Sequence, residues 1–213
     1  MELTSEEGRV LGCLVEKQLT TPQQYPLTEN ALIAACNQAT NRDPVVAYDV
    51  SNVRITARSL REKGLLRMVH RAGERSDKHH HLLDSSLALS QGQMTLLAVL
   101  LLRGPQTLAE LRLRSERMHA FDTMVEVQAE LDALTDRDDP LVARLERQPG
   151  RKEARYGQLL VKVEQHHPSS VSDEPAQHDP LTLVALAREV EMLRGEVAEL
   201  RAQIDRLGGT EGR

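Results

Sequence analysis

The sequence predicts a mainly helical α+β protein made of two tandem winged-helix domains and a C-terminal coiled-coil helix. Three observations predict it: an order of helix and strand signals that occurs twice, a β-hairpin pattern after each third helix, and a heptad repeat near the C-terminus. The expected boundaries are 1–86 and 87–163 for the two domains, 164–180 for a flexible linker and 181–208 for the coiled coil.

Capping boxes, in which a hydroxyl residue is followed three residues later by Glu or Gln, predict the first helix of each repeat. They begin at Thr4 and Ser90. The apolar positions of these two helices match at an offset of 85 residues. Second helices are expected to begin after Thr28 and Thr107, because hydroxyl residues favour the N-cap.

The third helices give the best match between the repeats, at an offset of 74 residues. Their predicted apolar faces are Val50, Val53, Ala57 and Leu60 in the first repeat, and Met124, Val127, Leu131 and Leu134 in the second. Strands are expected after them at 65–71 and 78–83, and at 141–145 and 154–160. Three helices followed by a hairpin are typical of a winged helix, in which the third helix usually reads DNA.

A coiled-coil seam is predicted from apolar residues that alternate at spacings of three and four over four heptads. The seam, which we expect to form the dimer interface, consists of Leu183, Leu186, Val190, Leu193, Val197, Leu200, Ile204 and Leu207. Three of the four a positions are β-branched and every d position is Leu, which favours a parallel two-stranded homodimer. The alternative is a helix that folds back on its own domain.

The net charge of −5 belongs to the C-terminal segment. Residues 163–213 contain 5 Lys and Arg against 10 Asp and Glu, whereas residues 1–162 contain 22 of each. Overall acidity therefore does not argue against nucleic acid as a partner. The sequence shows no signal-peptide pattern and its longest apolar run has seven residues, so we expect a cytoplasmic protein without a membrane partner. Cys13 and Cys36 are expected to be buried, reduced thiols.

The charge on the third helices predicts which repeat binds duplex DNA. In the second repeat, Gln128, Asp132 and Thr135 stand where the first has arginines. The predicted DNA-binding residues are Ser51, Asn52, Arg54, Arg58 and Arg61 on the third helix and Arg71, Arg75 and Lys78 on the wing. His70 and the three histidines 79–81 are expected to add charge below neutral pH. The predicted function is a dimeric transcriptional regulator; the alternative for the arginines is a solvated surface.

No nucleotide-binding, hydrolase or metalloprotease motif is present, so no enzymatic activity, cofactor or metal is expected. The four Tyr and Phe residues are too few for a stacking platform, so RNA is not expected as a partner. The competing hypothesis is a protein-interaction scaffold without direct DNA contact. A ligand-responsive sensor is a third option. The polar stretch 37–43 is expected to have a structural role, because Asn and Asp before Pro44 form turns; the alternative is contact with a phosphate or a ligand.

Several ordered motifs resemble the YceH-like family of bacterial tandem winged-helix proteins, whose function is not established. They include LGCLVEKQ at 11–18, TPQQYPL at 21–27, AACNQ at 34–38, NRDPV at 41–45, LLLRGPQT at 100–107 and PGRKEARY at 149–156. The resemblance covers residues 3–160. It implies the fold, and it implies no reaction, ligand or catalytic residue.

Overall fold

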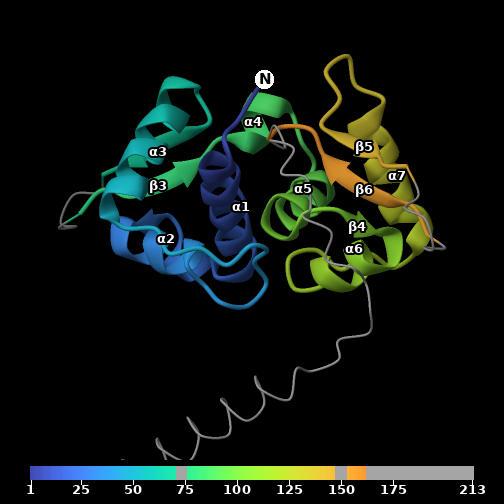
Figure 1. The fold of residues 1–213 in the computed structure, drawn as a ribbon, viewed down its shortest axis with the longest axis horizontal. Helices are drawn as coiled ribbons and strands as arrows, with labels where there is room; N and C mark the ends of the chain where they lie inside the picture. Colours follow the sequence, from blue (N-terminus) through green and yellow to red (C-terminus); the bar gives the residue numbers. More distant parts are fainter. Residues whose placement is uncertain (71–75, 147–152, 162–213) are drawn as a thin grey trace, which may run out of the picture. The chain divides into compact units, whose positions relative to one another are not determined.

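A computed structural model describes residues 1–70, 76–146 and 153–161 of the chain (Figure 1). Within these residues, seven α-helices and two small antiparallel sheets form a mixed α+β fold. None of the helices described is long and apolar enough to cross a bilayer. The predicted linker at 164–180, the coiled coil at 181–208 and all the predicted dimerisation residues lie outside the described residues.

The same order of elements occurs twice. The first repeat contains α1 (Ser5–Thr20), the 3-10 turn η1 (Pro22–Gln24), β1 (Leu27–Thr28), α2 (Glu29–Cys36), α3 (Val50–Glu62), β2 (Leu66–Val69) and β3 (Lys78–His81). After the short helix α4 (Leu83–Leu87), the second contains α5 (Gln91–Arg103), β4 (Gln106–Thr107), α6 (Leu108–Ser115), α7 (Met124–Thr135), β5 (Val142–Arg144) and β6 (Arg155–Gln158).

The predicted helix starts are confirmed by their capping bonds. The Thr4 hydroxyl accepts the Glu7 N–H at 3.2 Å, and the Glu7 carboxylate accepts the Thr4 N–H at 2.8 Å. Ser90 forms the same reciprocal pair in α5. Thr28 and Thr107 cap α2 and α6. These local bonds satisfy N–H groups that the helix itself leaves without acceptors.

Each sheet has three strands, in the orders β1-β3-β2 and β4-β6-β5. The two-residue strands β1 and β4 were not predicted, because a pair of residues carries no alternating pattern. Both sheets have the same register: Leu27 pairs with His79, and Gln106 pairs with Tyr156. The hairpin strands are shorter than expected at both ends, except that β3 begins at Lys78 as predicted.

Two details of the predicted pattern are wrong. Leu83 was expected to end a strand but begins α4, where it is buried and where the Ser86 N–H donates to the Leu82 carbonyl. Val50 was expected to face the core but is 40% exposed. As the first residue of α3, directly after the N-cap Asp49, it lies beyond the buried stripe.

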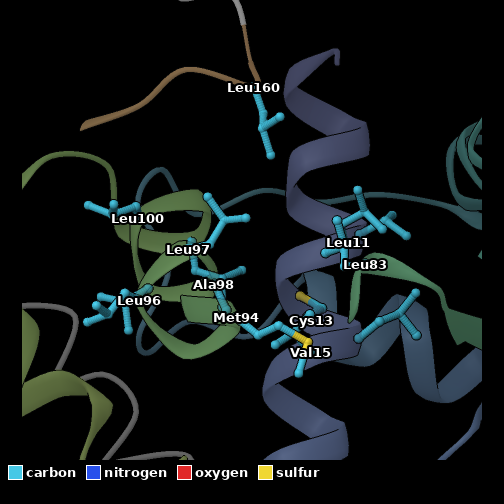
Figure 2. Packing of buried hydrophobic residues seen from close by; sticks show 14 of the residues in the cluster. Leu11, Cys13, Val15, Leu83, Met94, Leu96, Leu97, Ala98, Leu100 and Leu160 are labelled. Atoms are coloured by element: carbon cyan, nitrogen blue, oxygen red, sulfur yellow. The ribbon is translucent and has the colours of Figure 1, made fainter. Parts of the chain in front are cut away.

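The two repeats share one core, which α1 and α5 build together (Figure 2). Met94, Leu97 and Ala98 of α5 face α1 in this view. Gly12 allows the close approach, because a Cβ there would lie 2.9 Å from Cγ of Leu102. The residues that the structure describes accordingly belong to one compact unit.

The core also contains the two cysteines. Cys13 and Cys36 are both buried, as predicted, and no disulfide joins them in this structure. The Cys13 thiol donates a hydrogen bond of 3.3 Å to the carbonyl of Ala35. The pair therefore serves packing in this structure.

Candidate nucleic-acid interface

Helix α3 presents one buried face and one charged face. Its N-terminus is fixed by a capping box. The Asp49 carboxylate accepts the backbone N–H of Asn52 at 2.8 Å, and the side-chain carbonyl of Asn52 accepts the backbone N–H of Asp49 at 3.0 Å. Val53 and Leu60 are completely buried on the inner face. The outer face therefore exposes the residues that sequence reasoning assigned to DNA.

The three predicted arginines of α3 lie together along a groove between this helix and the hairpin. We call it the helix–hairpin groove; it has a volume of about 320 Å³ and is lined by Glu29, Arg54, Ala57, Arg58, Arg61, Met68, Ser76, Asp77 and His79. The arginines recur at intervals of four and three residues, which places them on one side of the helix. The spacing in the sequence was thus sufficient to predict this arrangement.

Two of these arginines form ion pairs at the surface. Arg54 donates two hydrogen bonds to Glu29, at 2.6 and 2.9 Å, although its side chain is 67% exposed. The hydrogen bond from Arg54 lowers the pKa of the Glu29 carboxyl. Arg58 pairs with Glu62, one helical turn away, at 3.1 Å. Exposed pairs of this kind contribute little to stability, so a phosphate can replace the carboxylate at small cost.

The other predicted residues differ in how available they are. Ser51 is exposed on the first turn of α3. Asn52 is exposed too, but its carbonyl oxygen is used in the cap, which leaves its amide N–H groups for a ligand. Lys78 is half-buried in β3, opposite Thr28 of β1. Arg71 and Arg75 lie outside the described residues.

The structure does not support the expectation that the histidines of β3 add positive charge below neutral pH. His79 is 4% exposed and His81 is fully buried. Burial lowers the pKa of His79 and of His80, and it lowers the pKa of His81 to about 4. Desolvation disfavours the charged imidazolium, so burial favours the neutral form of all three rings.

The second repeat has a groove at the corresponding place with different chemistry. Its volume is about 350 Å³, and it is lined by Leu108, Met124, Val125, Gln128, Ala129 and Asp132. Gln128 donates to Asp132 at 2.7 Å and accepts the hydroxyl hydrogen of Tyr156 at 2.9 Å. No arginine lines this groove, and its only charge comes from Asp132.

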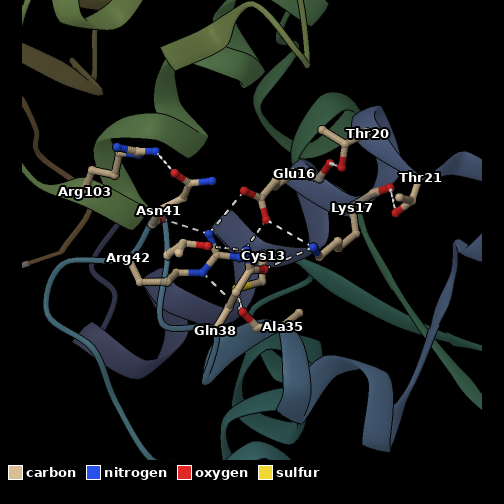
Figure 3. Close-up of polar contacts among 11 residues, drawn as sticks. Cys13, Glu16, Lys17, Thr20, Thr21, Ala35, Gln38, Asn41, Arg42 and Arg103 are labelled. Atoms are coloured by element: carbon tan, nitrogen blue, oxygen red, sulfur yellow. Dashed lines mark hydrogen bonds and ion pairs between the residues drawn. The ribbon is translucent and has the colours of Figure 1, made fainter. Parts of the chain in front are cut away.

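The loop that leads into α3 is held by a buried ion pair (Figure 3). Arg42, with a fully buried side chain, donates to the Glu16 carboxylate at 2.6 and 3.1 Å and to the Ala35 carbonyl at 3.2 Å. The side-chain amide of Asn37 accepts the backbone N–H of Tyr48 at 2.7 Å and donates to the Tyr48 carbonyl at 2.8 Å. These bonds support the structural role expected for the stretch 37–43. The Glu16–Arg42 pair was missed, because residues 26 apart in sequence give no local signal of contact.

The family to which the chain belongs follows from comparison with known proteins. Residues 3–151 match the family described as "Protein of unknown function, DUF480". A UPF0502 protein of Klebsiella pneumoniae is 42% identical to the chain, covering 97% of this chain and 96% of its own length. Another, from Koribacter versatilis, is 49% identical over 76% of this chain and 75% of its own. These matches agree with the YceH-like resemblance, and the chain belongs to this DUF480/UPF0502 family of uncharacterised bacterial proteins.

Proposed function

We propose that this protein binds duplex DNA through a winged helix in its first repeat. In this proposal α1, α2 and α3 form the helical part, α3 is the recognition helix, and the β2–β3 hairpin is the wing. The observation that carries the proposal is the helix–hairpin groove, where Arg54, Arg58 and Arg61 lie side by side on the outer face of α3.

The chemistry of this groove suits a polyanion. Guanidinium groups bind phosphate oxygens, or the O6 and N7 atoms of guanine, through paired N–H donors. Glu29 and Glu62 offset the charge of two arginines in the free protein. Within the described residues, Arg61 forms no ion pair with a carboxylate, so it supplies uncompensated charge at the end of the helix.

The proposal assigns DNA contact to the first repeat of each subunit. A helix that carries Asp132 where Arg58 stands in the first repeat would be repelled by phosphate, since B-DNA carries one charge per ~1.7 Å of axis. Two subunits, joined by the heptad seam at 183–207, would then supply two reading helices. Such a dimer would suit a (pseudo)palindromic site and a role in transcriptional regulation.

A scaffold function is favoured by a different observation. On the second repeat, Val125 of α7 is 76% exposed and Leu113 of α6 is 72% exposed. The adjoining groove, lined by Leu108, Met124 and Ala129, is mostly apolar. Exposed apolar surface of this kind suits a protein partner better than nucleic acid.

Fluorescence anisotropy with a mixed-sequence duplex distinguishes the two functions. The wild-type protein would be titrated at several salt concentrations beside Arg58→Gln/Arg61→Gln. We expect wild-type affinity to fall with salt, and the log–log slope of the variant to be smaller by about 2, because each lost phosphate contact removes ~0.9.

Arg117→Gln/Arg144→Gln is the matched control, because it also removes two exposed positive charges, but from the second repeat. It should keep the wild-type slope and affinity. Binding that weakens equally in both variants would show non-specific attraction to net charge. Wild-type protein that fails to bind duplex at low salt would contradict the proposal and favour the scaffold.

A further inference from the structure

A second polar pocket lies where the two repeats meet. It has a volume of about 480 Å³ and is formed by the loop before α3, the end of α5 with the turn into β4, one side of α6, and the first residue of β6. Its charged lining residues are Arg42, Asp43, Arg103, Glu110, Arg114 and Arg155. Pockets of 300–1,000 Å³ are typical of sites for small molecules.

The pocket has an excess of positive charge. Glu16 neutralises Arg42 at 2.6 Å, which leaves three guanidinium groups, those of Arg103, Arg114 and Arg155, against the two carboxylates of Asp43 and Glu110. Arg114 and Arg155 share one carboxylate, Glu110, at 3.6 and 3.4 Å. These distances exceed the ~2.7–2.9 Å of a strong charge-assisted hydrogen bond, so Glu110 holds neither arginine tightly. Arg155 also donates to the Pro105 carbonyl at 2.7 Å, which directs its guanidinium toward the turn before β4.

Arg103 is the least compensated of the three. Its guanidinium donates to the neutral side-chain carbonyl of Asn41 (Figure 3), and within the described part of the chain it has no carboxylate partner. Burial, followed by the nearby charge of Arg114, lowers the pKa of Arg103. The second effect is a repulsion between two cations, which an anion entering the pocket would relieve.

The walls of the pocket are fixed before any ligand arrives. Asn41 has a φ of 62°, in the left-handed region that Asn tolerates better than most residues. The Asp43 N–H donates to the Leu102 carbonyl at 2.8 Å, which ties this loop to α5. Gln106, which is 2% exposed, donates to the carbonyls of Arg103 and Gly104 at 3.0 and 3.2 Å. The arginines therefore project from a rigid frame.

We propose that this pocket binds a small phosphate-bearing molecule, with the phosphate held by Arg103, Arg114 and Arg155. Three guanidinium groups from three separate elements match the several oxygens of a phosphate better than the two of one carboxylate. Arg42 is the buried cation that positions the loop beside the ligand. The site is distinct from the helix–hairpin groove and does not depend on DNA binding.

Isothermal titration calorimetry of the full chain with pyrophosphate, at constant ionic strength, tests this site. We expect saturable binding that Arg103→Gln and Arg114→Gln each weaken about tenfold, as expected for the loss of one charge-assisted contact. Arg144→Gln, which removes an exposed charge from β5, should bind within about twofold of wild type. Arg58→Gln/Arg61→Gln should also bind normally, which separates this site from the proposed DNA interface.

Three outcomes would overturn the inference. The first is the absence of saturable heat at millimolar pyrophosphate. The second is equal weakening in Arg144→Gln, which would indicate attraction to overall charge. The third is binding of malonate as tight as that of pyrophosphate, which would reject phosphate as the recognised group. Thermal melting of each variant establishes that it is folded before titration.

Discussion

In the first repeat, Arg54 and Arg58 line the groove between the third helix and the hairpin, whereas Gln128 and Asp132 occupy the matching positions of the second. The strands beside them pair in the same register. The comparison separates two kinds of information. Capping residues and buried apolar positions specify the repeated framework, and the exposed faces are free to carry different chemistry.

The interiors of the repeats differ in the same way. Glu16 of α1 corresponds to Leu101 of α5 at the 85-residue offset. The first repeat therefore has an ion pair at a position where the second repeat has an apolar side chain. In the sheets, His81 pairs with Leu66, and its counterpart Gln158 pairs with Val142. The first repeat therefore contains titratable groups at positions where the second has none.

The largest effect is expected from Glu16→Gln. This change leaves Arg42, whose side chain is fully buried, without its carboxylate. An unpaired buried charge costs about 3–5 kcal/mol, so urea unfolding should show a loss of this size. Glu116→Gln, an exposed charge of the second repeat, is the control and should change stability by less than about 0.5 kcal/mol. A loss below ~1 kcal/mol in Glu16→Gln would show that the pair contributes no more than a surface pair.

A somewhat smaller loss of stability is expected when His81 becomes protonated in acid. The Leu83 N–H donates to Nδ1 of this ring at 3.2 Å, and its Nε2 contacts the Gln18 side-chain carbonyl, which fits a neutral ring with its proton on Nε2. Because the folded-state pKa is lowered from 6.5 to about 4, the unfolded chain binds the proton more tightly. The contribution of His81 to the free energy of unfolding is therefore fully present above pH 6.5. It decreases by about 3 kcal/mol as the pH falls toward 4.

Unfolding measured between pH 7 and pH 4 in wild type and in His81→Gln isolates this contribution. Glu7 acts in the same direction: burial raises its pKa, but hydrogen bonds from Lys63, Thr4 and Ser59 outweigh burial and lower it. The variant with Gln, the residue found at position 158, should therefore lose less stability in acid than wild type. Equal losses in both proteins would reject the assignment to His81; the exposed His70→Gln is the control.

The smallest effect is expected from Glu29→Gln in the helix–hairpin groove. This residue holds Arg54 through two hydrogen bonds, and the second repeat has Leu108 at the position after its matching threonine. If phosphate competes with Glu29, removing the carboxylate should strengthen duplex binding by ~1 kcal/mol, about fivefold, at low salt. Anisotropy titrations measure this change. Weaker binding would mean that Glu29 orients Arg54 for the duplex.

Much of the helical framework could be predicted from the sequence. The capping hydroxyls at Thr4 and Ser90 act within one helical turn, so their effect is visible in a few residues. The arginine face of α3 was predictable for the same reason, since helical spacing places it on one side. Strands β1 and β4, by contrast, exist only because β3 and β6 lie beside them.

The sequence by itself determined the repeated order of helices and hairpins, the caps, and the positions of the exposed arginines on α3. These features depend on neighbours three or four residues away. Only the tertiary structure decided that His79 and His81 are buried, that Arg42 meets Glu16, and that arginines of both repeats surround one pocket. Burial and charge pairing depend on residues distant in the chain: α1 meets the loop before α3 and strand β3 within the first repeat, and residues of both repeats meet at the pocket.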